Sequence, residues 1–401
     1  SFARTPGILS GSPFNSLNLY NESGLGNGPP GGEEFDARSW SNELQLQGET
    51  SDGTLEYIVG AFYSHTKKNE YIPVIVGPEQ AIQDALGGPL ADIAYYYRFT
   101  DESKAVFAQV NYHLTDSITA TAGGRYTWEK LRLKQLPGSL FNLDGSTPLP
   151  QKASLSDPSW TFSLQYQIDP ENMAYVAQRG SFRAGGFNGA VVPFNDANFF
   201  DNETTYDFEV GYKFNGYLGQ MPTRFNVAAY RQYVKDAQHS IFFLVAGNPA
   251  AFTVNVPEKR IQGIEMDANF VASEWLQFGF SGAYTDAKFT KPIVDLSAAT
   301  GVDGFSIPFD TYTDAPEWAG SVYAEVGLPI PDDWGSLKLR GDVFGQTSTY
   351  FSNNGGSITP RTKLPGYVTA DLRLGWNEFM GSGLSLAVFA KNLFDEFYYN
   401  S

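Results

Sequence analysis

The side chains that could do acid–base or metal chemistry are few and scattered. The chain has no cysteine, which removes thiolate chemistry and cysteine-based metal sites. Three histidines are present, no two of them within metal-ligand spacing: His65, His113 and His239. Carboxylates occur two residues apart, at Asp207 and Glu209 and again at Glu265 and Asp267. On an extended strand such a pair projects from one face, as a catalytic pair would, but a polar wall has the same spacing. We therefore predict no enzymatic activity, no metal site and no cofactor.

The elements that position these carboxylates are predicted to be β-strands with two unlike faces. In YDFEVGYKF (206–214) one parity is aromatic or aliphatic, and the other includes Asp207, Glu209 and Lys213. Strict alternation is typical of a strand with one apolar and one polar face. The same alternation surrounds three further charged pairs: Glu265 and Asp267, Lys338 and Arg340, and Asp371 and Arg373. In a soluble sandwich the apolar faces would form the core, whereas in a membrane barrel they would face lipid.

Composition narrows the possible partners. The 401 residues carry a net charge of −17 with no basic cluster in the sequence, which argues against nucleic acid. The longest apolar stretches, such as IFFLVA at 241–246, fall far short of the ~20 residues that a membrane-spanning helix needs. Mean hydropathy is −0.27, but barrel strands expose only every second residue to lipid. A helical membrane protein is excluded and a barrel is not.

Fourteen strands are predicted, joined by links of two alternating lengths. The predicted strands are 38–49, 54–67, 102–113, 117–134, 158–168, 171–183, 204–214, 222–244, 251–271, 274–289, 316–327, 335–350, 365–376 and 383–400. Short polar turns alternate with long links at about 68–101, 135–157, 184–203, 290–315 and 351–364. Consecutive hairpins with short turns at one end and long loops at the other produce this order. We predict an all-β fold, a transmembrane antiparallel β-barrel. A soluble exported β-protein explains the alternating faces but not the sorted loops and long strands.

Several stretches, in order along the chain, resemble the β-barrel of TonB-dependent outer-membrane receptors. They include KAVFAQVNYHLTDSITATAGGRYTWEK (104–130), AYVAQRGSFRAGGFN (174–188), RIQGIEMDANF (260–270) and LSLAVFAKNLFDEFYY (384–399). The resemblance is greatest to the subgroup of sphingomonad-like and related bacteria. It implies a barrel of 22 strands when complete, of which the fourteen predicted here are strands 8–21. A plug domain, seven strands and the last strand would then lie outside this sequence, and residues 1–37 would be an extracellular loop before the barrel segment 38–401.

The resemblance also implies partners and places for function. The partners would be outer-membrane lipid or lipopolysaccharide, the receptor's own N-terminal plug, TonB with its inner-membrane partners, and an extracellular small-molecule ligand. Aromatic side chains and one cation on the long loops are candidates for ligand contact, because they can stack on or surround a chelate: Tyr95, Tyr96, Tyr97, Arg98, Phe194, Phe199, Phe200, Tyr350 and Phe351. The charged face of the strands would line the lumen and contact the plug: Asp207, Glu209, Lys213, Glu265, Asp267, Lys338, Arg340, Asp371 and Arg373.

The expected function is TonB-energised uptake of a scarce solute across the cell outer membrane, with a ferric siderophore as the default cargo for the family. Two alternatives remain at this point. A passive porin would also need a β-barrel, and a soluble exported β-sheet binding protein would also show strands with two faces.

Overall fold

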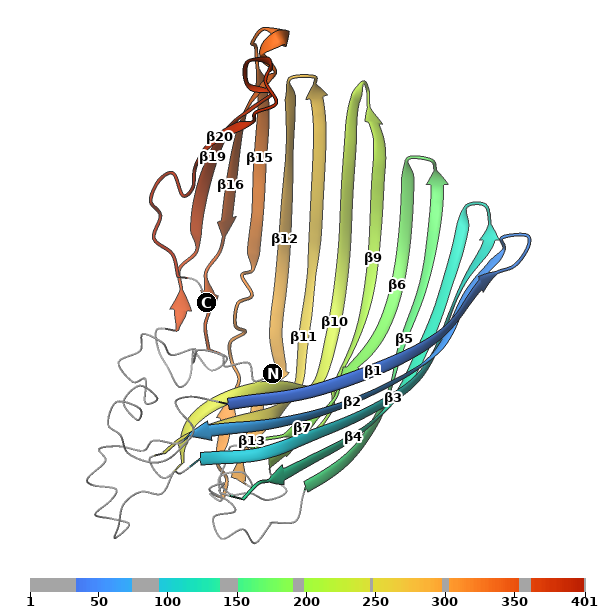
Figure 1. Ribbon diagram of the computed structural model, residues 1–401, viewed down its shortest axis with the longest axis vertical. Coiled ribbons are helices and arrows are strands. Elements are labelled where there is room, and N and C mark those ends of the chain that lie inside the picture. Colours follow the sequence, from blue (N-terminus) through green and yellow to red (C-terminus); the bar gives the residue numbers. More distant parts are fainter. Residues whose placement is uncertain are drawn as a thin grey trace.

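The computed structural model describes residues 34–73, 94–137, 151–189, 198–245, 248–297, 303–352 and 362–399. Most of these residues belong to one fourteen-stranded antiparallel sheet, in which each strand pairs with the next one along the chain (Figure 1). The strands are β1 (Glu34–Glu49), β2 (Leu55–Pro73), β3 (Ala94–Thr115), β4 (Ile118–Gln135), β5 (Gln151–Asp169), β6 (Asn172–Arg183), β9 (Glu203–Leu218), β10 (Met221–Val245), β11 (Asn248–Ser273), β12 (Leu276–Lys291), β15 (Trp318–Leu328), β16 (Ser336–Gln346), β19 (Tyr367–Asn377) and β20 (Leu386–Ala390). The predicted all-β fold with fourteen successive hairpin strands is confirmed.

Short turns join the strands at one end of the sheet and longer links join most of them at the other, as predicted; the exception is the link between β10 and β11, where only residues 246–247 separate the two strands. The short-turn end, at the top of Figure 1, includes two 3₁₀ turns, η2 (Asp332–Trp334) and η3 (Phe379–Gly381). At the long-loop end lie three two-stranded sheets: β7 (Gly186–Phe187) with β8 (Phe199–Phe200), β13 (Ile293–Asp295) with β14 (Ser306–Pro308), and β17 (Thr349–Tyr350) with β18 (Lys363–Leu364). No helix in the described ranges is long and apolar enough to cross a membrane.

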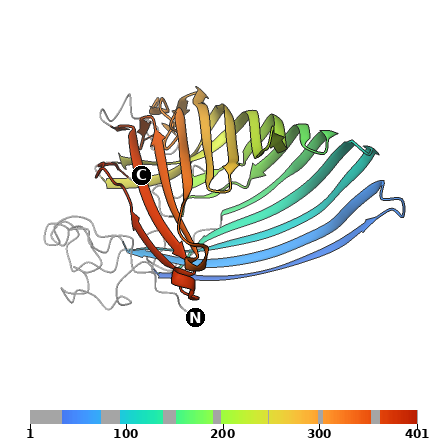
Figure 2. The ribbon, with the colours of Figure 1, turned by 90° about the horizontal axis from the view of Figure 1, so that it is seen from above.

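The sheet is strongly curved, so that it has a concave inner face and a convex outer face (Figure 2). On β4 the exposure of the side chains follows strand parity. On β4, Thr127, Glu129 and Leu131 are buried, whereas the alternate residues Trp128 and Lys130 are exposed. The buried parity lies on the concave side of the sheet, and the exposed parity faces outward.

The cross-strand register carries this assignment from strand to strand. Val176, Val210 and Ala229 are successive partners, as are Phe280, Val322 and Val343. Directly opposed residues share a face, so in these parts of the strands the apolar parity is outward and the charged parity is inward. An apolar outer surface is the reverse of a soluble sandwich, whose apolar faces would be covered.

The outward apolar band has the height of a hydrocarbon layer. On β4 it runs from Ile118 at the short turn to Trp128. Ten residue steps of ~3.4 Å, on a strand tilted by ~40°, give about 26 Å of height, against ~25 Å for barrels of the outer membrane. Paired aromatic rings mark the edge of the band nearest the long loops, on the outer face: Trp40 with Tyr63, Tyr126 with Trp128, Tyr206 with Tyr233, and Tyr284 with Trp318. Such a belt of rings is expected where lipid meets water.

Several predicted boundaries were wrong, because strand pairing continues into segments expected to be loops. The expected loop 68–101 is strand up to Pro73 and again from Ala94, since β2 and β3 remain paired over this whole length. The expected loop 135–157 ends earlier, because β5 begins at Gln151. The expected strand 335–350 differs in the other direction: β16 ends at Gln346, and Thr349–Tyr350 form the separate short strand β17, which pairs with β18.

The predicted strand 383–400 was also wrong in extent. Strand β20 covers only Leu386–Ala390. Beyond it, Asn392 and Asp395 adopt φ values of 48° and 54°. Asn392 also exchanges hydrogen bonds with the Glu396 backbone, at 2.9 Å in both directions. This asparagine-centred turn ends the strand, because it replaces ladder hydrogen bonds with local ones.

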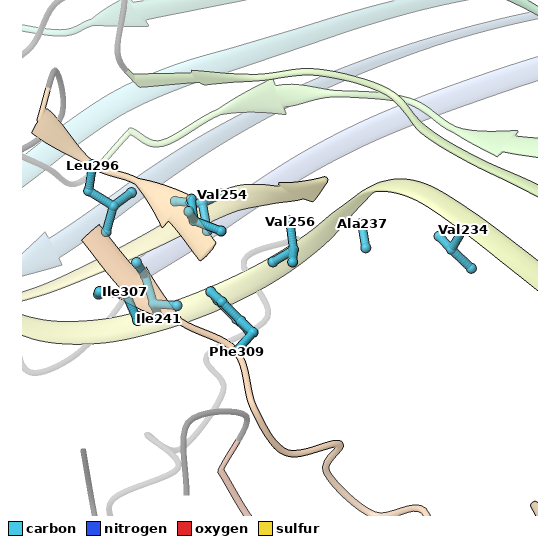
Figure 3. Close-up of a cluster of buried hydrophobic side chains, with 9 residues drawn as sticks. Val234, Ala237, Ile241, Val254, Val256, Leu296, Ile307 and Phe309 are labelled. Carbon is cyan, nitrogen blue, oxygen red and sulfur yellow. The ribbon is translucent and has the colours of Figure 1, made fainter. Parts of the chain in front are cut away.

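A small apolar core lies at the long-loop end and not between layers. The hairpin of β13 and β14 packs on the extended ends of β10 and β11 (Figure 3). Its buried members are Val234, Ala237, Ile241, Val254, Val256, Val294, Leu296, Ile307 and Phe309. This core therefore holds the β13–β14 hairpin against the sheet at the long-loop end, which is called the mouth below. The rest of the sheet is stabilised mainly by hydrogen bonds between neighbouring strands.

Candidate functional site

The inner face of β6 and β9 carries a charged cluster around Arg179. Its guanidinium Nη2 lies 2.7 Å from an oxygen of Asp207 and 2.7 Å from an oxygen of Glu209. The Tyr175 hydroxyl donates a hydrogen bond of 2.8 Å to Glu209, and the Lys213 ammonium lies 5.5 Å from the centre of the Tyr175 ring. One arginine thus bridges two carboxylates that would otherwise repel each other across a single strand pleat.

The neighbouring strands extend the polar wall. The Asn226 amide donates to both oxygens of Asp267, at 3.1 and 2.9 Å, and Glu265 lies on the same inward face of β11. Farther round, Lys338 pairs with Glu325 at 2.9 Å. All of these side chains point into the concave side of the sheet.

On β16 and β19 the inner face carries two opposed like-charge pairs. Arg340 is the direct register partner of Arg373, and Asp342 is the partner of Asp371. Arg340 folds back onto Asp342 at 2.6 Å, and the Asp371 carboxylate accepts the backbone N–H of Asn392 at 2.8 Å. All nine charged residues expected on the lumen side therefore lie on one continuous inner surface, while their role against a plug remains a prediction.

The aromatic candidates of the long loops do not form one group. Tyr95 to Arg98 lie in strand β3, whose register puts Tyr95 and Tyr97 on the inner face and Tyr96 and Arg98 on the outer face. Arg98 donates a hydrogen bond of 2.8 Å to Asn69 on the neighbouring strand. A run of four residues on a strand cannot all face one ligand, because successive side chains point to opposite sides.

Three of the remaining candidates, Phe199, Phe200 and Tyr350, lie in the small sheets of the long-loop end. Phe199 and Phe200 form β8, and the Phe199 ring lies 5.3 Å from Phe187 on β7. Tyr350 lies in β17 with the Lys363 ammonium 5.9 Å from its ring centre, and Phe351 is exposed. Phe194 lies outside the described residues.

Residues 186–189 form a strap across the mouth that no sequence pattern indicates. Gln135 of β4 donates a hydrogen bond of 3.0 Å to the Gly189 carbonyl. On the other side, Asn188 donates to the Thr253 carbonyl at 2.9 Å and accepts the Thr253 backbone N–H at 2.8 Å. Gly189 fits against the Tyr97 ring so closely that an added Cβ would lie 2.7 Å from it. The strap therefore connects β4 and β11 across the inner side of the mouth.

The described residues contain no group of three or more histidine, cysteine, aspartate or glutamate side chains that could hold a metal ion. The inner surface carries many hydrogen-bonding groups and charged groups of both signs. Side chains on adjacent strands hold these groups in place through hydrogen bonds and salt bridges. Such a surface can bind a polar protein domain or a solute reversibly, with no covalent step.

Comparison with known proteins gives the family. The model of the family described as "TonB dependent receptor-like, beta-barrel" matches residues 7–393. Among solved structures, the ferric yersiniabactin uptake receptor FyuA from Yersinia pestis is 18% identical with a TM-score of 0.64, over 92% of this chain and 51% of that one. The ferric-catecholate import receptor Fiu from E. coli K12, in its closed form, is 14% identical with a TM-score of 0.65, over 91% and 52%. The copper transporter OprC is 13% identical with a TM-score of 0.65, over 92% and 52%. The chain thus spans about half the length of the structures that it matches, and it belongs to the TonB-dependent receptor family, in the β-barrel domain.

Proposed function

We propose that the protein imports a scarce solute across the outer membrane with energy supplied through TonB, and that the solute is a metal chelate, a ferric siderophore first. The observation that carries the proposal is the family match over residues 7–393, together with an inner wall that is charged along its length. The names of similar structures support a metal-containing cargo, since they are receptors for ferric chelates and a copper transporter.

The inner charges are proposed to hold a plug domain. Salt-bridged groups such as Arg179 with Asp207 and Glu209 keep fixed positions, so a partner surface meets a rigid pattern of donors and acceptors. Exposed pairs of this kind contribute little binding energy each. A plug held by many weak polar contacts can be displaced without a large barrier, as transport requires.

Ligand contact is proposed for the inward or mouth-facing aromatic residues: Tyr95, Tyr97, Phe199, Phe200, Tyr350 and Phe351. The outward positions of Tyr96 and Arg98 remove them from this set. Aromatic faces suit a planar or aromatic chelator, because stacking needs no matched hydrogen-bond pattern.

The proposal is tested by uptake in the source bacterium. Deletion of the gene should abolish accumulation of one ⁵⁵Fe-labelled siderophore and slow growth under iron limitation, and deletion of the gene for TonB should give the same loss. Parallel measurements with ⁶⁴Cu and labelled cobalamin identify the cargo if iron uptake is unchanged. Uptake that persists without TonB or in the presence of a protonophore would show a passive porin instead.

A further inference from the structure

A pair of carboxyl groups lies in contact on the inner face of β3 and β4, just beyond the apolar band. Glu129 follows Trp128, where the band ends, and is only 9% exposed. Its register partner on β3 is Ser103, and Asp101 is the next inward residue of β3 toward the long loops. The carboxyl groups of Asp101 and Glu129 lie within hydrogen-bonding distance of each other. Two groups that carry the same charge when ionised are thus in contact at a largely buried position.

One oxygen of each carboxyl group is buried without a hydrogen-bond donor: Asp101 Oδ1 and Glu129 Oε2. The other Glu129 oxygen accepts a hydrogen bond of 2.7 Å from the Ser103 hydroxyl. An ionised carboxylate can only accept hydrogen bonds, so two ionised groups cannot satisfy each other. A protonated carboxyl group donates one hydrogen bond, so a single proton on either group supplies the donor that the contact lacks.

No cation neutralises the pair. In the part of the chain that the structure describes, no lysine, arginine or histidine nitrogen lies within salt-bridge distance of Asp101 or Glu129. Arg125 lies on the same face of β4, but its side chain is engaged elsewhere. It donates a hydrogen bond of 3.1 Å to the Thr127 hydroxyl, and its guanidinium lies 5.1 Å from the centre of the Phe62 ring.

The charged groups on the neighbouring strands also have other contacts. On β2, Lys68 is paired with Glu70 at 2.6 Å, and His65 acts on the pair only through its charge. On β5, Asp157 accepts a hydrogen bond from the Asn202 amide. The surroundings therefore give the two carboxyl groups no direct ionic partner, and a shared proton is the simplest way to balance their charge.

The electrostatics of the site agree with a retained proton. Burial is the main cause that raises the pKa of Glu129 to about 7; the Ser103 hydrogen bond opposes this rise and the Asp101 charge adds to it. Burial also raises the pKa of Asp101. The contact can therefore keep a proton up to neutral pH, where carboxyl groups in water are ionised.

The pair belongs to the buried row of β4 that ends at the strap. The inward residues after Glu129 are Leu131, Leu133 and Gln135, which are 3%, 0% and 1% exposed. Gln135 holds the Gly189 carbonyl of the strap. A second negative charge at the start of this row favours its opening to water, because a buried charge without a partner is costly.

We propose that Asp101 and Glu129 share one proton and form a pH-dependent clasp, which keeps the mouth end of β3 and β4 packed at acidic pH and loosens it as the proton is lost. The inference concerns the wall alone and does not depend on the cargo.

The test is amide hydrogen exchange of the full-length receptor in lipid vesicles, expressed as protection factors so that the intrinsic pH dependence of exchange is removed. An opened Glu129 ionises near its ordinary value of 4.5 and the packed one near 7. Protection of residues 99–105 and 127–133 should therefore fall by about 10- to 100-fold between about pH 5 and pH 8.

Two variants separate the clasp from a general effect of inner carboxylates. Glu129→Gln is neutral at every pH and its amide can donate to Asp101, so protection should change by less than about twofold over the same range. The matched control is Glu325→Gln, which removes an inner-face carboxylate that is paired with Lys338 at 2.9 Å. It should keep the native pH dependence in β3 and β4.

Infrared spectroscopy of the native protein tests the proton without any variant. A band of a protonated carboxyl group should be present near pH 6, should disappear as the pH rises to about 9, and should be unaffected by millimolar calcium. The proposal is overturned by protection that does not change with pH, by an unchanged pH dependence in Glu129→Gln, or by absence of the carboxyl band near pH 6. Loss of the band on addition of calcium would also overturn it, because the pair would then be a cation site.

Discussion

Val322→Arg should destabilise the barrel because it puts a cation near the middle of the lipid layer. Val322 is 53% exposed on the outer face of β15, six residues from Leu328 at the short turn and four from Trp318 in the belt. Six steps of ~3.4 Å at ~40° tilt place it about 16 Å above the turn, in a band about 26 Å high. Arginine at such a depth costs about 2–4 kcal/mol. The folding equilibrium should therefore fall by roughly 30- to 1,000-fold.

The matched control is Ser321→Arg on the same strand. Ser321 faces the inner side, where its hydroxyl lies 2.8 Å from that of Ser281, so the new cation should remain hydrated and cost less than ~1 kcal/mol. Urea titration of the full-length receptor in phosphatidylcholine vesicles, followed by mobility in unheated SDS gels, gives both free energies of unfolding. Equal losses, or a larger loss for Ser321→Arg, would refute the assignment of faces.

Three more perturbations test other parts of the structure. Lowering the pH from 7 to 4 should loosen the long-loop end of the β10–β11 hairpin. Burial of the His239 imidazole, and secondly the charge of Lys259, lower the pKa of His239 to about 4. The imidazole of the unfolded chain takes up its proton near pH 6.5, so the stability of the hairpin falls as the pH drops from 6.5 to 4, by about 1–2 kcal/mol after allowance for partial exposure. Hydrogen exchange of the hairpin amides measures this loss. The variant His239→Phe should remove the pH dependence. Gly53→Val should cost about 1–2 kcal/mol in urea unfolding, because Gly53 has a φ of 69° in the first short turn, whereas Gly53→Asn should be tolerated. Arg179→Met should cost about 1 kcal/mol by leaving Asp207 and Glu209 to repel each other, and Asp207→Asn in the same chain should restore part of the loss.

Each of these three has an outcome that contradicts it. Unchanged exchange rates in the hairpin between pH 7 and 4 would show that the His239 proton is not linked to its packing. A neutral Gly53→Val would mean that the turn has another accessible geometry. If Asp207→Asn destabilised the Arg179→Met protein further, the aspartate would have another partner on the inner wall.

Period-two alternation made the strands and their faces predictable. In 206–214 the charged residues alternate regularly with apolar residues. Together with the two classes of loop length, this alternation predicted that the charged residues face inward. The Tyr-rich segment 94–99 has no such alternation, and its strand character comes from pairing with β2. Sequence alone cannot show this, because the partner residues supply the register.

The strap at 186–189 illustrates the same limit, because its hydrogen bonds join Asn188 to Thr253 on a strand more than 60 residues away. Contacts across the mouth depend on how the sheet curves, which no local pattern encodes.

That strap has a mechanical consequence. Ladder hydrogen bonds run along the wall and resist the sliding of one strand past another, but they do little against flattening of the cross-section. The bonds from Gln135 to Gly189 and from Asn188 to Thr253 run across the opening, from one side of the wall to the other. They link β4 to β11 at the long-loop end, so we expect the separation of these two strands to depend on the four residues as well as on the ladder between neighbouring strands.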